Sequence, residues 1–401
     1  MTTDPIRNAL DEARVIVCAG TGGVGKTTIA AALAVEAARS GRRTLVLTID
    51  PARRLANAFG LETLGNEPAR IPLGCPSART PGTPDPFLEV MMLSTRQAFD
   101  QLVHRLTPDP AARRRILENR IYRHLSQALA GSSEYAAMAE VQALVETLRY
   151  DLIVVDTPPA EHALDFLRAP ARLQAFLDSR FFQALVRPAM SASRLSLRLF
   201  ARPLHRALGL LERIAGLGFL EDLTELLRAL DGLSSDLSDR ARRIQAVLFG
   251  DETRFVLVCR ALAGSERSTQ EIVAGFGGLG AQLVSLIVNR MQPWSARVSP
   301  AELLERCQGE ALTADLRILS DVLEPDPNAK AAVHPEQEIA AAILEHARTC
   351  LLEEKRFAAL ADAARASGIG CARVAEQAAP LDRLEGLLEL ASQLTGGESR
   401  R

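Results

Sequence analysis

Short apolar runs alternate along the chain with longer segments of helical periodicity. The runs end in glycine, proline or aspartate, as buried strands commonly do. They predict strands at Arg14–Ala19, Thr44–Thr48, Phe87–Leu93, Leu152–Val155, Arg254–Cys259 and Leu283–Val288, with Cys371–Ala375 as the candidate for the last strand. Because helical segments separate successive strands, the pattern predicts a doubly wound α/β fold with a mostly parallel sheet.

The helical segments suggest how the chain is divided. An alanine-rich helix follows the first strand, and Gly41 is placed to stop it. Residues 170–247 are helical throughout and interrupt the alternation, so we predict a core of residues 1–169 and 251–401 with a helical insertion at 170–250. Further helices are predicted over 95–149, 300–368 and 381–394. Six prolines between Pro68 and Pro86 predict that residues 60–86 form an irregular surface loop.

The loop after the first strand carries the clearest chemical pattern. Gly20–Thr27 matches G-x-x-x-x-G-K-[ST], with a predicted strand before it and a predicted helix after it. Glycines let backbone N–H groups surround a polyphosphate, the lysine neutralises phosphate oxygens, and the threonine hydroxyl is a ligand for Mg²⁺. The chain has only three lysines, so a lysine at this position of the loop is not expected by chance, which favours a role in binding phosphate. The motif predicts a P-loop NTPase core.

Two aspartates end predicted strands near this loop. Asp156 closes LIVVD and Asp50 closes TLVLTID. Ligands of doubly wound sheets bind at the carboxyl ends of the strands, so both carboxylates are expected to face the phosphates. An aspartate that merely caps a turn is the plainer alternative for each, but the neighbouring phosphate loop favours a ligand role.

Composition narrows the class of protein. The 401 residues are 47% hydrophobic, which is enough to bury a sizeable core, and the net charge of −2 argues against a nucleic-acid-binding field. The six cysteines are irregularly spaced and form no Cys-x-x-Cys pair, so we expect reduced thiols without a disulfide framework or a structural zinc site. The amino terminus lacks the pattern of a signal peptide, and no apolar stretch reaches the ~18 residues of a membrane span. These features predict a cytoplasmic protein.

The motifs together resemble a known family. The Gly-Gly-Val-Gly-Lys-Thr-Thr loop has the deviant Walker A form of the ArsA-type ATPases, which include arsenical pump-driving ATPases and targeting ATPases for tail-anchored membrane proteins. Residues 48–59 resemble the switch I segment of that family, with its Asp-Pro-Ala, and residues 150–167 resemble its switch II segment. LIVNRM resembles the strand whose asparagine recognises adenine, and residues 379–391 resemble the late nucleotide-proximal loop and final helix. Residues 91–102 and 129–144 look most like the bacterial ArsA-like subgroup.

The resemblance implies a role for each matching residue. Lys26 would bind the phosphates and take part in catalysis, Asp50 would position or activate the attacking water, and Asn289 would read adenine. Thr27, Asp50 and Asp156 would hold Mg²⁺, partly through water, while Asp156 and His162 would belong to switch II. The nucleotide-binding residues implied are Gly22, Gly23, Val24, Gly25, Lys26, Thr27, Thr28, Asn289 and Pro380, with Mg²⁺ as cofactor and ATP as substrate.

The sequence departs from the family pattern at three points. The family's second loop lysine, which reaches the partner's nucleotide across a dimer, is Thr21 here, so hydrolysis is expected to be slow unless Arg53, Arg54 or a lysine-bearing paralogue replaces it. Glu161 stands where the family has a small or basic residue. The cysteines that hold zinc in the targeting branch or metalloid in the arsenite pumps have no counterpart.

The predicted insertion is basic and amphipathic. Between residues 170 and 213 it contains eight arginines and two acidic residues, with four phenylalanines among leucine and methionine. A helical subdomain that packs on itself with solvated arginines is the simpler interpretation. The alternative is a surface for an apolar helix, an acidic partner or an anionic membrane.

Three functions fit these observations. The favoured hypothesis is a dimeric Mg-ATP-hydrolysing switch that couples nucleotide state to a helical partner-binding subdomain. The second is a weakly hydrolysing or non-hydrolysing scaffold, or one half of a heterodimer with a paralogue, which Thr21 motivates. The third and least favoured is a motor for an arsenite or oxyanion pump. None of the three binds nucleic acid.

Overall fold

The computed structural model describes most of the predicted core and only the two ends of the predicted insertion. The described residues are 5–49, 54–74, 86–93, 100–119 except 102, 106 and 108, 122, 132–157, 163–177, 236–306, 335–377 and 383–395.

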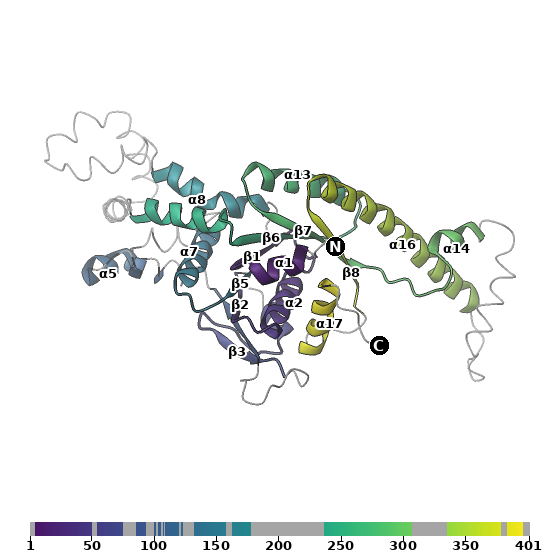
Figure 1. The fold of residues 1–401 in the computed structure, drawn as a ribbon, viewed down its shortest axis with the longest axis horizontal. Helices are drawn as coiled ribbons and strands as arrows, with labels where there is room; N and C mark the ends of the chain where they lie inside the picture. Colours follow the sequence, from purple (N-terminus) through teal and green to yellow (C-terminus); the bar gives the residue numbers. More distant parts are fainter. Residues whose placement is uncertain are drawn as a thin grey trace, which may run out of the picture.

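An eight-stranded sheet forms the centre of the described chain, in the order β3-β4-β2-β5-β1-β6-β7-β8 (Figure 1). Every neighbouring pair is parallel except β3 with β4. The strands are β1 Val15–Gly20, β2 Thr44–Thr48, β3 Ala69–Pro72, β4 Phe87–Met92, β5 Leu152–Asp156, β6 Thr253–Cys259, β7 Leu283–Met291 and β8 Gly370–Ala375. The predicted α/β class and all seven predicted strands are confirmed, with ends that shift by at most a few residues.

Helices cover both faces of this sheet, which explains why its central strands are apolar on both sides. On one face, α1 Pro5–Glu12, α2 Lys26–Arg39 and α17 Leu384–Leu394 share one buried cluster with the sheet. On the other face, α7 Ser132–Glu146 and α13 Ser265–Gly278 contribute to a second cluster. The alanines of α2 are fully buried, which lets this helix lie close against the sheet with α17 beside it (Figure 1). Gly41 ends α2 at φ +90°, as predicted.

In the proline-rich segment, the prediction of an irregular loop over residues 60–86 is wrong in one part. Residues 69–72, expected to be part of an irregular loop, form β3, which pairs antiparallel with β4 at the edge of the sheet. Ile71 is buried against the sheet, and Pro72 is tolerated because an edge strand leaves one row of its backbone N–H groups without a ladder partner. The many prolines of this segment predicted a loop, and the strand among them was missed because it is only four residues long.

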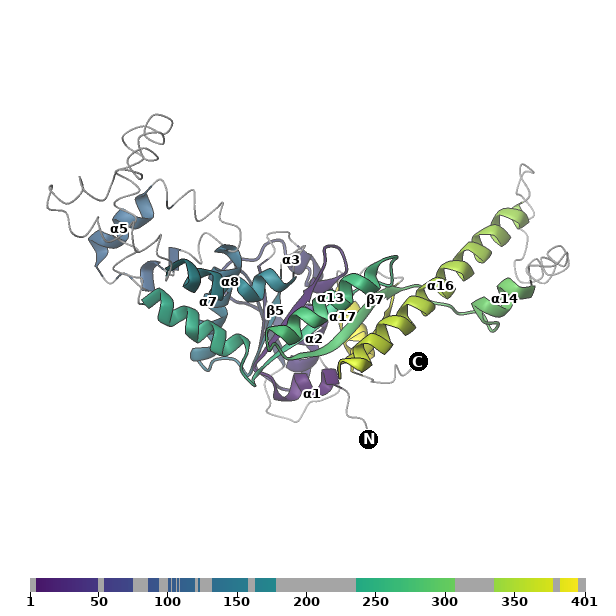
Figure 2. The ribbon, with the colours of Figure 1, turned by 90° about the horizontal axis from the view of Figure 1, so that it is seen from above.

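The remaining helices lie to either side of the sheet. They are α3 Arg54–Ala58, α5 Pro110–Glu118, α8 Ala163–Leu177, α14 Pro300–Arg306 and α16 Pro335–Ala366, with a further helix over residues 236–248. Both views show α14 and the far end of α16 extending away from the sheet on the side opposite to α5 (Figures 1 and 2). None of the helices in these described ranges combines the length and the apolar character that crossing a membrane requires.

The two described ends of the predicted insertion pack on the core. α8 runs past residue 170 with Pro170 inside it, and the helix at 236–248 places Ala241, Ile244 and Leu248 in the same buried cluster as the sheet. Residues 178–235, which include most of the basic amphipathic stretch, lie outside the described residues. The division into a core and an insertion therefore stays a prediction.

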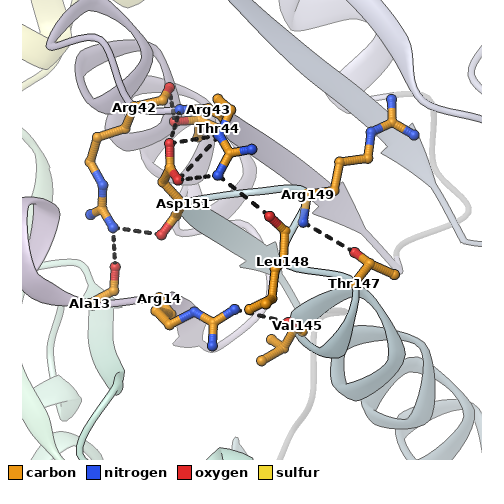
Figure 3. A network of polar contacts seen from close by, with 10 residues as sticks. All are labelled: Ala13, Arg14, Arg42, Arg43, Thr44, Val145, Thr147, Leu148, Arg149 and Asp151. Atoms are coloured by element: carbon orange, nitrogen blue, oxygen red, sulfur yellow. Dashed lines mark hydrogen bonds and ion pairs between the residues drawn. The ribbon is translucent and has the colours of Figure 1, made fainter.

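Arginines tie together the amino ends of three strands, at the edge of the sheet opposite to the glycine loop (Figure 3). Arg42 donates hydrogen bonds to the carbonyl oxygens of Leu10 within α1, Ala13 between α1 and β1, and Asp151 directly before β5. Arg43 forms an ion pair with the Asp151 carboxylate, with Nη2 and Oδ1 2.6 Å apart, and this pair lowers the pKa of Asp151. The Arg42 contacts hold the amino end of β5 beside those of β1 and β2, and so help to place its carboxyl end beside the loop.

Candidate nucleotide-binding site

The predicted phosphate loop joins β1 to α2 and depends on glycine at two positions. Gly25 precedes the first residue of α2 at φ +94°. Gly20 has φ +150°, and a Cβ there would lie 2.2 Å from the Val258 carbonyl oxygen. No other residue type adopts these conformations at so little cost in so little space. The loop therefore passes close over β6 and presents its backbone N–H groups at the amino end of a helix, where anions bind.

Lys26 and Thr27 lie beneath the exposed part of this loop. Both side chains are on the first turn of α2 and are buried, whereas Thr21, Gly22 and Gly23 are exposed. The ammonium of Lys26 donates to the Thr21 carbonyl oxygen at 2.8 Å, which holds it under the loop. The arrangement places a cation and a hydroxyl at the base of a glycine-lined anion site.

Asp156 is the last residue of β5, between β2 and β1. Its register partners are Thr48 on β2 and Cys18 on β1, two residues before the loop begins. It is fully buried, and the Thr48 hydroxyl donates to its Oδ2 at 2.9 Å. Burial and the Asp156 carboxylate together raise the pKa of the Cys18 thiol, which stays protonated at neutral pH. The structure thus brings Asp156 to the sheet edge where the loop lies.

Sequence reasoning did not single out the groups that orient Asp156. The Thr48 hydroxyl holds its carboxylate, and the hydroxyl of Thr157 donates to the Cys18 carbonyl oxygen at 2.8 Å. The second bond ties the chain after β5 to β1. The threonines that close TLVLT and follow LIVVD were the available signal, since both stand at strand ends beside a predicted carboxylate.

Several predicted site residues lie outside the described residues: Asp50, His162 and Pro380, together with Arg53 and Glu161. The chain approaches Asp50 through Ile49, whose N–H donates to the Asp156 carbonyl oxygen at 3.2 Å. The described chain therefore leads into the Asp50 segment from beside Asp156.

Asn289 lies against the loop itself. Its Nδ2 donates to the Val24 carbonyl oxygen at 2.8 Å, and its Oδ1 accepts from the Arg290 N–H at 2.9 Å. A Cβ on Gly25 would come within 2.3 Å of the same Nδ2, so the two residues are in close contact. The family resemblance placed Asn289 at the nucleotide, but the sequence did not predict this contact with the phosphate loop.

Oxygen donors at this edge fit a magnesium ion. Mg²⁺ prefers hydroxyl, carboxylate and water oxygens, and Thr27 and Asp156 supply the first two from adjacent elements. A nucleoside triphosphate fits the glycine loop for the reasons given above. The described site thus suits a Mg-nucleotide.

Comparison with known proteins agrees with this geometry. Residues 13–310 match the model of the ArsA ATPase family, which is described as "Anion-transporting ATPase". The chain belongs to the ArsA ATPase family. It is 28% identical over 281 residues to "ATPase get3" of Aspergillus terreus, covering 69% of this chain and 73% of that protein. The corresponding protein of Aspergillus niger is 27% identical over 279 residues, with the same coverage, and "ATPase GET3" of Malassezia globosa is 28% identical over 176 residues, 43% of this chain and 47% of that protein.

Membership in the ArsA ATPase family decides the class of reaction. The protein is an ATPase, which converts ATP and water into ADP and phosphate. The predicted family, fold class and enzyme class are thereby confirmed.

Proposed function

We propose that the protein is a Mg-ATP-dependent switch, in which one phosphate site drives changes in a helical partner-binding region. The observation that carries the proposal is the placement of Lys26 and Thr27 beneath the glycine loop, with Asp156 at the end of the adjacent strand. These groups come from β1, α2 and β5, so a nucleotide at the loop would contact two central strands of the sheet and the helix that follows the first of them.

Each residue would contribute a different interaction. The loop N–H groups and Lys26 would bind the β- and γ-phosphates, and Thr27, Asp50 and Asp156 would hold Mg²⁺, partly through water. When bound, the ion would neutralise charge that develops on the phosphate oxygens. The Asp50 carboxylate would orient the attacking water and accept its proton. His162, following Asp156 in switch II, would carry the change of nucleotide state towards the helical region.

Base recognition would come from Asn289, with Pro380 near the base. A side-chain amide has two N–H donors and two acceptor lone pairs, and the bonds to Val24 and Arg290 use one of each. The remaining donor and acceptor match the adenine edge. Equal affinity for ATP and GTP in a competition experiment would remove this role from Asn289.

The switch would act as a dimer. The chain has a single phosphate loop, so a shared nucleotide interface needs a second chain, either a second copy or a paralogue. Residues 170–250 are the proposed contact for a protein client or an anionic membrane, on the strength of their arginine-rich, amphipathic sequence. The reaction takes place in the cytoplasm under this proposal.

A non-hydrolysing scaffold is the second candidate, because Thr21 removes one cation from each site. Steady-state phosphate release separates the two functions. The switch predicts Mg²⁺-dependent release, slow but above the background of Asp50→Asn protein. Release equal to that background, with ATP still bound, would favour the scaffold or a heterodimer.

A further inference from the structure

The contact between Asn289 and the phosphate loop joins segments 265 residues apart in the chain. The Nδ2–oxygen distance to Val24 is 2.8 Å, and both residues are buried. The Arg290 N–H, on a residue with φ +55°, occupies the amide oxygen and so turns the amide nitrogen towards the loop. The orientation of the Asn289 side chain is fixed from both of its ends.

The loop is held at two separate points. Gly25 approaches the Asn289 amide so closely that a methyl group would not fit, and Gly20 approaches the Val258 carbonyl in the same way. β6 therefore supports the start of the loop, while β7, through Asn289, supports its end. Gly25 in turn accepts from the Ile29 N–H at 3.0 Å and directly precedes Lys26. A shift of Val24 and Gly25 would move the first turn of α2 and its phosphate-binding groups.

We propose that Asn289 is a positioning residue for the phosphate loop, which it holds in the conformation that binds polyphosphate whatever base is attached. The inference rests on the proposed function of this site and extends it. A residue that only reads adenine contributes nothing to a ligand that has no base. A residue that holds the loop contributes equally to ligands with and without one.

Inorganic tripolyphosphate separates these two roles. The main variant is Asn289→Asp, which keeps the size of the side chain and the acceptor for Arg290 but replaces the donor with an oxygen facing the Val24 carbonyl. Asn289→Ala is the second variant, since it removes the donor without adding that repulsion. Gln292→Ala is the matched control, because Gln292 follows on the same segment but contacts Glu353 and Glu376 instead of the loop.

The measurement is the affinity of each protein for Mg-tripolyphosphate and Mg-ATP by isothermal titration, at a temperature well below each melting midpoint. We expect both Asn289 variants to bind tripolyphosphate more weakly than wild type by about tenfold or more, because a buried carbonyl loses its only side-chain donor from β7. Gln292→Ala should bind both ligands like wild type.

The possible results distinguish this inference from the proposed function. If both Asn289 variants bind tripolyphosphate as tightly as wild type and lose only ATP affinity, Asn289 reads the base alone and the positioning role is wrong. If wild type binds neither ligand, the proposed nucleotide site fails and the inference fails with it. A loss of tripolyphosphate affinity equal to that in Gln292→Ala would also overturn the positioning role, since it would report a general disturbance of the segment.

Discussion

At the scale of single residues, the site depends on groups that hold other groups. Thr48 orients the Asp156 carboxylate, and Lys26 is held under the loop by the Thr21 carbonyl. Preorganised charges of this kind account for most of the catalysis in phosphoryl transfer, because the protein contributes position and electrostatics and forms no covalent bond. Replacing a residue that acts on the attacking water should therefore affect rate more than binding.

Asp50→Asn tests this expectation. The amide keeps the shape of the carboxylate but does not accept a proton, so we expect ATP affinity close to wild type and hydrolysis lower by roughly 10²–10⁴-fold, the usual contribution of a general base. Titration of ATP and a phosphate-release assay on the same preparation measure the two quantities. Unchanged turnover would exclude Asp50 from the reaction.

At the scale of elements, side-chain hydrogen bonds at the amino ends of β1, β2 and β5 help to hold these strands side by side, at the end of the sheet remote from the loop. Arg42 connects the segments around α1, β1 and β5 through the carbonyl oxygens of Leu10, Ala13 and Asp151, and Figure 3 shows the last two of these contacts. Its guanidinium is partly buried, which lowers its pKa, but arginine remains charged at any physiological pH. Its hydrogen bonds are therefore charge-assisted. Removal of the guanidinium would leave the three carbonyl oxygens without this donor.

Arg42→Met should destabilise the protein by about 2 kcal/mol, because hydrogen bonds to charged groups contribute more than neutral ones. Urea unfolding followed by circular dichroism measures the change. Arg43→Met is the matched control, since the neighbouring Arg43 is largely exposed and its ion pair with Asp151 should contribute little. Equal destabilisation by the two substitutions would contradict the role given to Arg42.

Within the part of the chain that the structure describes, α7 carries a buried side-chain amide, that of Gln142, without a hydrogen-bond partner. Gln142 is 1% exposed, and neither its Oε1 nor its Nε2 has a hydrogen-bond partner within the described structure. A buried amide without partners costs stability, so Gln142→Met should raise the free energy of unfolding by about 1–2 kcal/mol. The same urea experiment tests this. A lower unfolding midpoint in Gln142→Met would show that the amide finds a partner in solution.

The sequence predicted the sheet and the phosphate loop better than it predicted their supports. A buried parallel strand is a continuous apolar run in the sequence, and the loop glycines are required by the local backbone geometry. The strands and the loop can therefore each be predicted from a single segment of the sequence. β3 was missed because it is short and lies among prolines. The contacts of Asn289 with Val24 and of Thr48 with Asp156 join distant segments, and only the sheet order brings them together.

At the scale of the whole molecule, the proposed switch needs two chains for each active assembly. Thr21 lies exposed in the loop, where the family resemblance places a lysine that reaches the partner's nucleotide. A cation supplied in trans contributes a factor of about 10³–10⁵ to the rate in related phosphoryl transfers, so its loss should leave hydrolysis slow.

The described part of the chain is elongated. The helix α14 and the far end of α16 extend from the sheet in the direction opposite to α5 (Figure 2).

A dimer promoted by ATP is the corresponding prediction. Analytical ultracentrifugation should show a larger species with a non-hydrolysable ATP analogue than without it, and Thr21→Lys should tighten that dimer or speed its turnover. If Arg53 or Arg54 supplies the cation instead, Arg53→Ala or Arg54→Ala should slow turnover while Thr21→Lys changes little. A protein that stays monomeric under all conditions, also with a lysine-bearing paralogue, would contradict the dimer.

The affinity of Lys26→Ala protein for Mg-ATP, measured by isothermal titration beside wild type, tests the assignment of the nucleotide site to the glycine loop most directly. Lys26 is the cation held beneath the loop, and its loss removes charge-assisted hydrogen bonds to the phosphates. Wild type should bind Mg-ATP, and Lys26→Ala should bind it roughly 10- to 100-fold or more weakly, with an unchanged melting midpoint in the absence of ATP. Equal affinity in the two proteins would show that the glycine loop is not where this ATPase binds its nucleotide.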